Sequence, residues 1–293
     1  MTAVQATAPV KAKKTSQGLE VFKRFCKNPL AIIGLIIFST FVILAILAPY
    51  IAPYKLEDMD FMAINQAPNA QHLLGTDRFG RDLFSRLLYG SRYSLVMGVS
   101  ATIISTLLGM ILGAIAGYFG QVADNIVMRL TDIFQAIPGI LFSMTISTVL
   151  GPGLFPTILA LSIGGLAGTA RMLRSLVLQI RSSEYIEAAQ SINCSNLRII
   201  IKHIVPNTFG PILVGCTMGI GGVIMQAASL SFIGLGIQPP LTEWGALLTE
   251  GRNYMNQCPW LLVYPGLCIG LISLAACFMG DGLRDAMDPR LKK

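Results

Sequence analysis

The stretch that decides the fold is RSSEYIEAAQSINCSNLRIIIKHIVPN, residues 181–207, a polar segment between two long apolar runs. Its pattern predicts two short helices joined by an elbow. Ser183 can cap the first helix, and Glu184 and Glu187 place negative charge near the positive end of its dipole. Asn193 marks the elbow, because Asn is second only to Gly in adopting the left-handed conformation that ends helices.

The second helix of this hairpin is expected to begin at Ser195 or Asn196, to run through LRIIIKHI and to end at Pro206. Ala188 and Ala189 keep one side of the first helix flat. A flat alanine surface flanked by charges fits the groove of another protein, whereas an ordinary interfacial hairpin would only hold two membrane helices apart. The spacing alone leaves both interpretations open.

The composition is that of an integral membrane protein. Of the 293 residues, 53% are hydrophobic and 13% are charged, and the mean hydropathy is +0.64, which is far outside the range of soluble globular proteins. At about 20 residues for each crossing, this length allows about six spans. We expect the spans at residues 30–51, 94–118, 126–150, 154–172, 209–237 and 260–280.

Individual residues within the spans predict how the helices pack. Gly109, Gly113 and Gly117 form a face that another helix can approach closely. We expect this face inside the bundle, with a homodimer seam as the alternative. Arg129 and Asp132 are three residues apart and can pair with each other, and Pro138 should kink the third span.

Three polar residues lie in the fifth span, where they must face protein or water. Gln226, Ser229 and Ser231 are therefore candidates for lining a pathway, although hydrogen bonds between helices explain them equally well. No metal site is expected, because the six cysteines lack metal-ligand spacing and the two histidines fall on opposite sides of the membrane. In the external loop, Asp77 and Asp82 are expected in turns and at a helix cap.

Lysine and arginine are distributed unequally between the two sides of a six-span protein. Sixteen of the 22 fall on the side of the termini and the hairpin. The six on the other side are Lys55, Arg78, Arg81, Arg86, Arg92 and Arg252. Both termini and the hairpin are therefore expected in the cytoplasm, and the net charge of +7 is not taken as a sign of a nucleic-acid partner.

The chain divides into three predicted parts. Residues 1–20 are expected to form a disordered cytoplasmic tail, and residues 21–91 an amphipathic lead-in, the first span and an external loop. Residues 92–293 would form the core domain with five spans. The sequence has neither a GxxxxGK[ST] stretch nor a Gly-rich turn between a strand and a helix, so we expect no cofactor on this chain.

The hairpin resembles the EAA loop in the membrane subunits of ABC importers. The matching residues are Glu187, Ala188, Ala189, Asn193, His203 and Pro206. Asn193 stands where the family has glycine, and His203 stands where it has isoleucine, as is common in the peptide-transporting branch. Residues 72–95, residues 231–245 and the C-terminal tail resemble the dipeptide, oligopeptide and nickel permeases of this family.

This resemblance implies an all-α membrane protein with six transmembrane helices and the type I ABC importer permease fold, whose cytoplasmic EAA coupling helices meet an ATPase. The six matching residues would form the ATPase-coupling site. The resemblance also implies the bacterial cell (inner) membrane as the location, contact with membrane lipid, and a heterodimeric pore with a second homologous permease. Two cytoplasmic ATP-binding subunits would hold ATP and Mg, and an extracytoplasmic substrate-binding protein would deliver the substrate.

Peptides, either dipeptides or oligopeptides, are the substrates that the resemblance implies, with nickel or a metal chelate as the alternative. Two other classes of protein make different predictions. A secondary transporter driven by an ion gradient should carry buried acids at mid-membrane, and the centres of these spans have none. A passive channel or scaffold should bind no ATPase.

Overall fold

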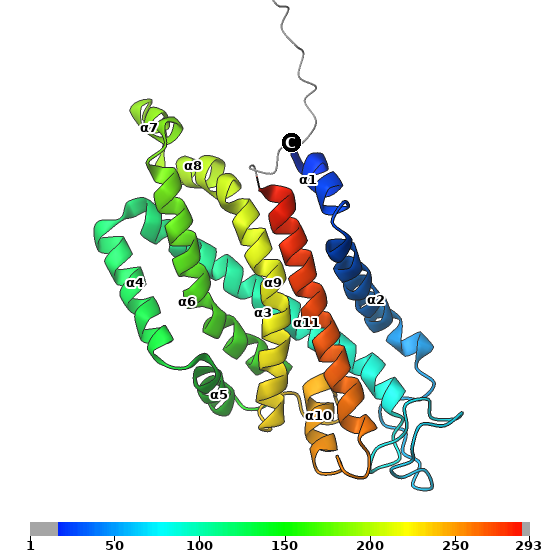
Figure 1. Cartoon of the computed structure of the whole chain (residues 1–293). Helices are drawn as coiled ribbons and strands as arrows, with labels where there is room; N and C mark the ends of the chain where they lie inside the picture. The colour runs from blue at the N-terminus through cyan, green and yellow to red at the C-terminus, as the bar shows by residue number, and fades with distance from the viewer. Residues whose placement is uncertain (1–16, 289–293) are drawn as a thin grey trace, which may run out of the picture.

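The computed structural model describes residues 17–288, which form a bundle of long helices with short helices at both ends (Figure 1). The elements are α1 (Gln17–Phe25), α2 (Pro29–Ile51), α3 (Leu83–Phe119), α4 (Gln121–Ala136), α5 (Gly139–Leu150), α6 (Leu154–Arg181), α7 (Glu184–Ser191), α8 (Asn196–Ile199), the π-helix η1 (Ile200–Ile204), α9 (Val205–Phe232), α10 (Trp244–Arg252) and α11 (Trp260–Met287). The predicted tail lies outside the described residues up to residue 16.

Five helices in the described part are long and apolar enough to cross a membrane, and α4 with α5 would make a sixth, broken span. With this bent pair counted as one span, the total agrees with the six spans predicted from the sequence. The break between α4 and α5 is 88°. It falls at Pro138, the predicted kink, because proline has no N–H for the helix ladder and forces Ile137 into an extended conformation.

The glycine face of α3 packs against α6, inside the bundle as expected. A Cβ added to Gly113 would lie 2.5 Å from the carbonyl oxygen of Ala170, and one on Gly117 would lie 2.7 Å from Cβ of Val177. Such distances leave no room for a side chain. The glycines therefore allow the backbones of α3 and α6 to approach closely.

Two ion pairs join α4 to α6, and one of them corrects a sequence prediction. Asp132 accepts a hydrogen bond of 2.8 Å from Nη2 of Arg171, so its partner is not Arg129. Arg174 pairs with Asp124 in the same way. The prediction was wrong because it considered one helix in isolation, whereas α6 lies alongside α4 and brings its own arginines to these carboxylates.

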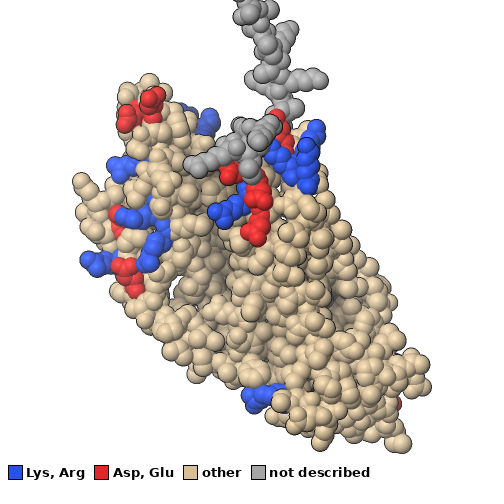
Figure 2. Space-filling model, in the orientation of Figure 1, with Lys and Arg blue, Asp and Glu red and all other residues tan. Residues whose placement is uncertain are grey.

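Charged side chains mark one end of the molecule. On the face drawn in Figure 2, most of them gather at the end that carries α1, α4 and α7, and a wide band across the middle is uncharged. The opposite end carries α10 and the loop between α2 and α3 (Figure 1). An uncharged band between two polar ends is the pattern expected of helices that cross a lipid bilayer.

Candidate functional site

The first helix of the polar hairpin, α7, follows an extended Ser183 at the predicted capping position. The hydroxyl of Ser183, however, donates to the carbonyl oxygen of Ile180 at 2.5 Å and does not accept from α7. The position was therefore predicted correctly, and the side-chain bond was not. The last turn of α6 competes for this hydroxyl, since its final carbonyl groups have no partner within their own helix.

The elbow forms as predicted at Asn193, which adopts a left-handed conformation with φ of 57°. Its N–H donates to the carbonyl oxygen of Gln190 at 2.9 Å, and the N–H of Cys194 donates to that of Ala189 at 3.0 Å. These two bonds are those of a Schellman motif, which satisfies the last carbonyls of a helix. Asn193 therefore fixes the angle at which the chain leaves α7.

The two alanines of the hairpin point in different directions. Ala188 is exposed, while Ala189 is buried in a hydrophobic cluster with Ile186 of α7. Tyr185, Ala188 and Ile192 are spaced so that they share one face of α7. The exposed fractions of Tyr185 and Ile192 are 46% and 78%. This face is apolar and uncovered, so it suits contact with another protein.

Pro206 does not end the second helix, which corrects another prediction. The chain passes from α8 through η1 into α9, and the N–H of Val205 donates to the carbonyl oxygen of Ile200, five residues back. This wider π turn ends where α9 begins, so Pro206 occupies the first turn of α9, where proline needs no donor. His203 lies in η1 and is half-buried.

The hairpin packs against three membrane-spanning helices. Residues from α7, α8 and η1 form one buried cluster with residues of α3, α6 and α9. The members that the structure places deepest include Leu173, Val177, Ile186, Ile199 and Ile204. Tyr118 at the end of α3 also donates a hydrogen bond of 2.8 Å to Oδ1 of Asn196. A displacement of the hairpin must therefore act on α3, α6 and α9 together.

The three predicted pathway residues differ in their exposure. Gln226 faces the start of α5, where its Nε2 would lie 3.7 Å from a Cβ on Gly139. Ser229 is exposed and donates to the carbonyl oxygen of Met225 at 2.9 Å, whereas Ser231 is buried near Gly236. Ser231 is thus enclosed while Ser229 is open, and lining of a pathway by these residues stays a prediction.

A cavity of about 230 Å³ lies between α3, α6 and α9. Its polar lining comes from Thr102, Ser105 and Thr106 of α3 and from Thr169 of α6. Sequence reasoning missed these residues because a hydroxyl in an apolar helix gives no signal of which neighbour it faces. Their common face could have been noticed only from the helical spacing of the first three.

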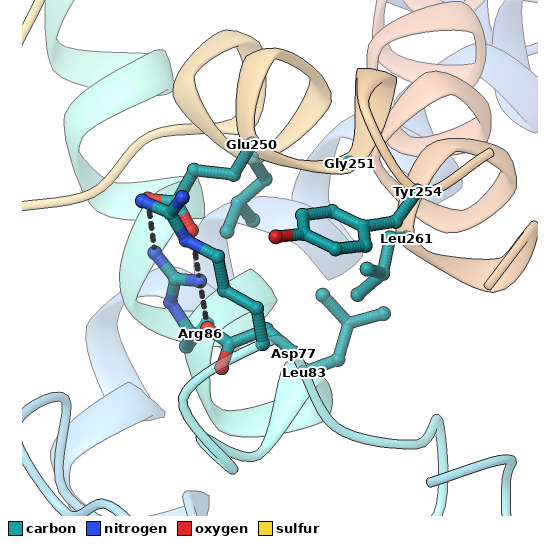
Figure 3. Close-up of a pocket in the computed structure, with 9 residues that line it drawn as sticks. Asp77, Leu83, Arg86, Glu250, Gly251, Tyr254 and Leu261 are labelled. Atoms are coloured by element: carbon teal, nitrogen blue, oxygen red, sulfur yellow. Dashed lines mark hydrogen bonds and ion pairs between the residues drawn. The ribbon is translucent and has the colours of Figure 1, made fainter. Parts of the chain in front are cut away.

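The opposite end of the molecule holds a buried ion-pair network, and Figure 3 shows the part of it formed by Asp77, Arg86 and Glu250. Arg86 of α3 donates through Nη1 to Asp77 at 2.6 Å, and through Nη1 and Nη2 to Glu250 of α10 at 2.7 and 2.9 Å. Arg81 also contacts both carboxylates, at 2.7 and 2.9 Å. The network joins the outer loop and α3 to α10. Asp77 does lie in a turn as predicted, accepting from the N–H of Phe79, but its ion pairs could not be read from local spacing.

A second contact fixes α10 at the same end. Glu243 is 1% exposed and accepts hydrogen bonds of 2.7 Å from the N–H groups of Gly245 and Ala246. Ser94 of α3 donates to it at 3.3 Å and accepts from the N–H of Trp244. Burial raises the pKa of the Glu243 carboxyl group. Asp82 caps α3 as predicted, accepting from the N–H of Ser85 at 2.8 Å.

Glu250 has the opposite pKa shift. Burial alone would raise the pKa of its carboxyl group, but the hydrogen bonds from Arg86 and the charges of the neighbouring arginines outweigh burial. The pKa of Glu250 is therefore held below its ordinary value of 4.5. A lowered pKa in the folded state means that the carboxylate stabilises the fold above pH 4.5, and that this contribution is lost as the pH falls through the lowered pKa.

Replacing Glu250 by glutamine is accordingly expected to lower the melting temperature at neutral pH. The difference in melting temperature between wild type and variant should become smaller as the pH falls. The measurement compares the detergent-purified wild type with Glu250→Gln between neutral pH and about pH 3. Titration of Glu243 is common to both proteins and cancels in the difference. A difference in melting temperature that stays constant across this range would contradict the role given to the charge of Glu250.

These features define a multi-pass helical membrane protein with a polar hairpin exposed at one end. Residues 109–293 match the family described as binding-protein-dependent transport system inner membrane component, and residues 16–68 match the N-terminal TM domain of oligopeptide transport permease C. The chain belongs to the family of binding-protein-dependent transport system inner membrane components, as its resemblance to the ABC importer permeases predicted. It is a transport permease subunit.

Several relatives are similar over nearly their whole length. The dipeptide transport system permease protein DppC of Alkalihalophilus pseudofirmus is 42% identical, with 93% of this chain and 90% of the relative covered. The glutathione transport system permease protein GsiD of Pectobacterium atrosepticum is 39% identical, with 99% and 97% covered. The oligopeptide transport system permease protein OppC of Bacillus subtilis is 38% identical, with 97% and 93% covered.

Solved structures show the same fold. The inward-facing MetNI methionine ABC transporter contains a chain that matches with a TM-score of 0.59 at 19% identity, with 70% of this chain and 98% of that chain covered. At this level of identity the likeness concerns the fold alone. It agrees with the expected type I ABC importer permease fold.

Proposed function

We propose that this chain forms half of the translocation pathway of an ATP-driven importer of peptides. Its partners would be a second homologous permease, two cytoplasmic ATP-binding subunits that hydrolyse ATP with Mg, and an extracytoplasmic substrate-binding protein. The protein would reside in a bacterial cell membrane with both termini and the hairpin in the cytoplasm. Residues 92–293 would act as the core permease domain, and residues 21–91 as its N-terminal extension.

The observation that carries this proposal is the hairpin, exposed on one side and buried on the other. The exposed apolar face around Ala188, beside Glu187, offers a docking surface to a motor subunit. The buried side continues into α3, α6 and α9. Closure of the ATP-binding subunits would displace the hairpin, and the hairpin would tilt these helices to alternate access across the membrane.

The six proposed coupling residues would have different roles. Glu187 and Ala188 would contact the ATP-binding subunit, since both side chains are exposed. Ala189 would keep α7 close to the buried cluster, and Asn193 would hold the elbow. His203 and Pro206 would shape the join between the hairpin and α9, where the π turn lies.

Peptides are favoured over nickel as the substrate. The relatives that match nearly the whole chain are named for dipeptide, oligopeptide and glutathione transport. Glutathione is itself a small peptide. All three relatives are named for the transport of peptides, and each matches this chain over nearly its full length, which supports peptide cargo for the present chain.

The proposal is tested by purifying the tagged chain from its native membrane and reconstituting the complex in vesicles. ATP-binding subunits are expected to co-purify, and the uptake of short peptides should require ATP and the binding protein. An ionophore that collapses ion gradients should leave uptake intact. Uptake that follows the ion gradient would indicate a secondary transporter, and purification without any ATP-binding subunit would indicate a channel or scaffold.

A further inference from the structure

Three of the four hydroxyl groups around the cavity between α3, α6 and α9 share one hydrogen-bonding arrangement. Thr102 donates its hydroxyl hydrogen to the carbonyl oxygen of Gly98 at 2.7 Å, within α3. Ser105 donates to that of Thr102 at 3.2 Å, and Thr169 donates to that of Gly165 at 3.3 Å, within α6. The hydroxyl hydrogens of Thr102, Ser105 and Thr169 are therefore used by the helices that carry them, whereas Thr106 forms no such bond within the described part of the chain.

This arrangement determines what the cavity offers to a ligand. A hydroxyl group has one hydrogen to donate and two lone pairs that accept. Because the hydrogens are already used, the oxygens of Thr102, Ser105 and Thr169 present acceptors. The lining residues that the structure describes include neither acids nor bases. The cavity therefore suits a neutral group that carries N–H donors.

The cavity does not end at these hydroxyls. Met172 and Gly215 line both this cavity and a second one of about 410 Å³, which continues along α9 to Arg284 and Asp288 near the end of α11. The two cavities thus adjoin and extend from the middle of the bundle toward the end that carries the hairpin. A ligand leaving the hydroxyl-lined cavity has space ahead of it in that direction.

We propose that the hydroxyl-lined cavity is a subsite for peptide cargo in transit, in which Thr102, Ser105 and Thr169 accept hydrogen bonds from backbone amide N–H groups. This inference rests on the proposed function. Every peptide bond without proline brings one N–H, and leaving it unpaired in an apolar environment is costly. Since the lining is uncharged, the subsite would accept peptides regardless of the charge of their side chains.

The alternative is that these hydroxyl groups only form hydrogen bonds within their own helices, as serine and threonine often do in membrane spans, and bind no ligand. Thr217 provides the matched control. It lies on α9 and donates to the carbonyl oxygen of Leu213 at 2.8 Å, the same internal bond, but it does not line the cavity. Replacing threonine by valine keeps the shape and removes only the hydroxyl oxygen.

The test uses the reconstituted complex with its binding protein and measures ATP-dependent uptake of short alanine peptides and of the same peptides methylated at every peptide nitrogen. Thr102→Val and Thr169→Val are each expected to slow uptake of the unmethylated peptide roughly two- to tenfold, the usual worth of one hydrogen bond. Uptake of the methylated peptide should change little. The ratio of the two rates therefore falls, and the binding protein's own preference cancels because it is the same throughout.

Thr217→Val should leave this ratio unchanged, and Thr102→Ser, which keeps the hydroxyl, should restore it to the wild-type value. Recovery of each variant from the membrane and its ATP hydrolysis rate show that the complex has assembled. If both valine variants assemble and keep the wild-type ratio, or slow the two peptides equally, the subsite is refuted while the import function stands. A wild-type complex that imports none of the unmethylated peptides refutes the proposed function itself.

Discussion

Replacing Ala188 by arginine is expected to abolish ATP-driven uptake while leaving the protein in the membrane. Ala188 lies between the exposed side chains of Tyr185 and Ile192 on the free face of α7. A long charged side chain there would hold the ATP-binding subunit away from this apolar surface, and it would leave the buried side of the hairpin unchanged. Co-purification of the ATP-binding subunits and the rate of peptide uptake should therefore fall together, to background.

The control for this variant is Ala70→Arg, which places the same side chain on an exposed alanine of the outer loop. It should retain both co-purification and uptake. Recovery of each variant from the membrane shows that the chain has inserted. Normal uptake by a properly inserted Ala188→Arg protein would remove the hairpin from the coupling mechanism.

Replacing Arg86 by methionine is expected to cause the largest loss of stability at the other end of the molecule. Arg86 is 3% exposed and pairs with both Asp77 and Glu250. Its removal leaves two carboxylates facing each other with only Arg81 between them, and breaking one partner of a buried ion pair costs about 3 to 5 kcal/mol. The melting temperature in detergent should fall, and proteases should cut the loop between α2 and α3 faster.

Arg252→Met is the matched control for that experiment. Arg252 is an exposed arginine of α10 whose guanidinium lies 4.9 Å from the ring of Phe232, outside the buried network. Its loss should cost about 1 kcal/mol or less, the worth of an exposed cation–π contact. If the two variants melt at the same temperature, the network does not hold α10 to the outer loop.

Local chemistry allowed much of this structure to be predicted. The apolar spans follow from composition, and the elbow follows from Asn193, whose left-handed conformation is a property of the residue itself. The close packing of α3 follows from its glycines at four-residue spacing. Each of these features depends on neighbours within one or two helical turns, which a sequence displays directly.

The features that could not be predicted depend on which helices become neighbours. Local spacing pairs Asp132 with Arg129, whereas its partner in the structure, Arg171, lies on another helix. Arg86 and Glu250 are far apart in the chain, so their ion pair has no local pattern. An isolated helix would end at Pro206, whereas here the π turn η1 precedes this proline, and Ile204 of η1 lies in the cluster shared with α6 and α9.

Coupling of the hairpin to an ATP-binding subunit requires that the hairpin lie on the cytoplasmic side of the membrane. The direct measurement replaces the six native cysteines, introduces Glu187→Cys, and treats right-side-out and inverted membrane vesicles with a membrane-impermeant thiol reagent. Because Glu187 is exposed, the new thiol will react wherever the reagent can reach it. The account predicts labelling in inverted vesicles and protection in right-side-out vesicles. Labelling in right-side-out vesicles would place the hairpin outside the cell, where no ATP-binding subunit could reach it.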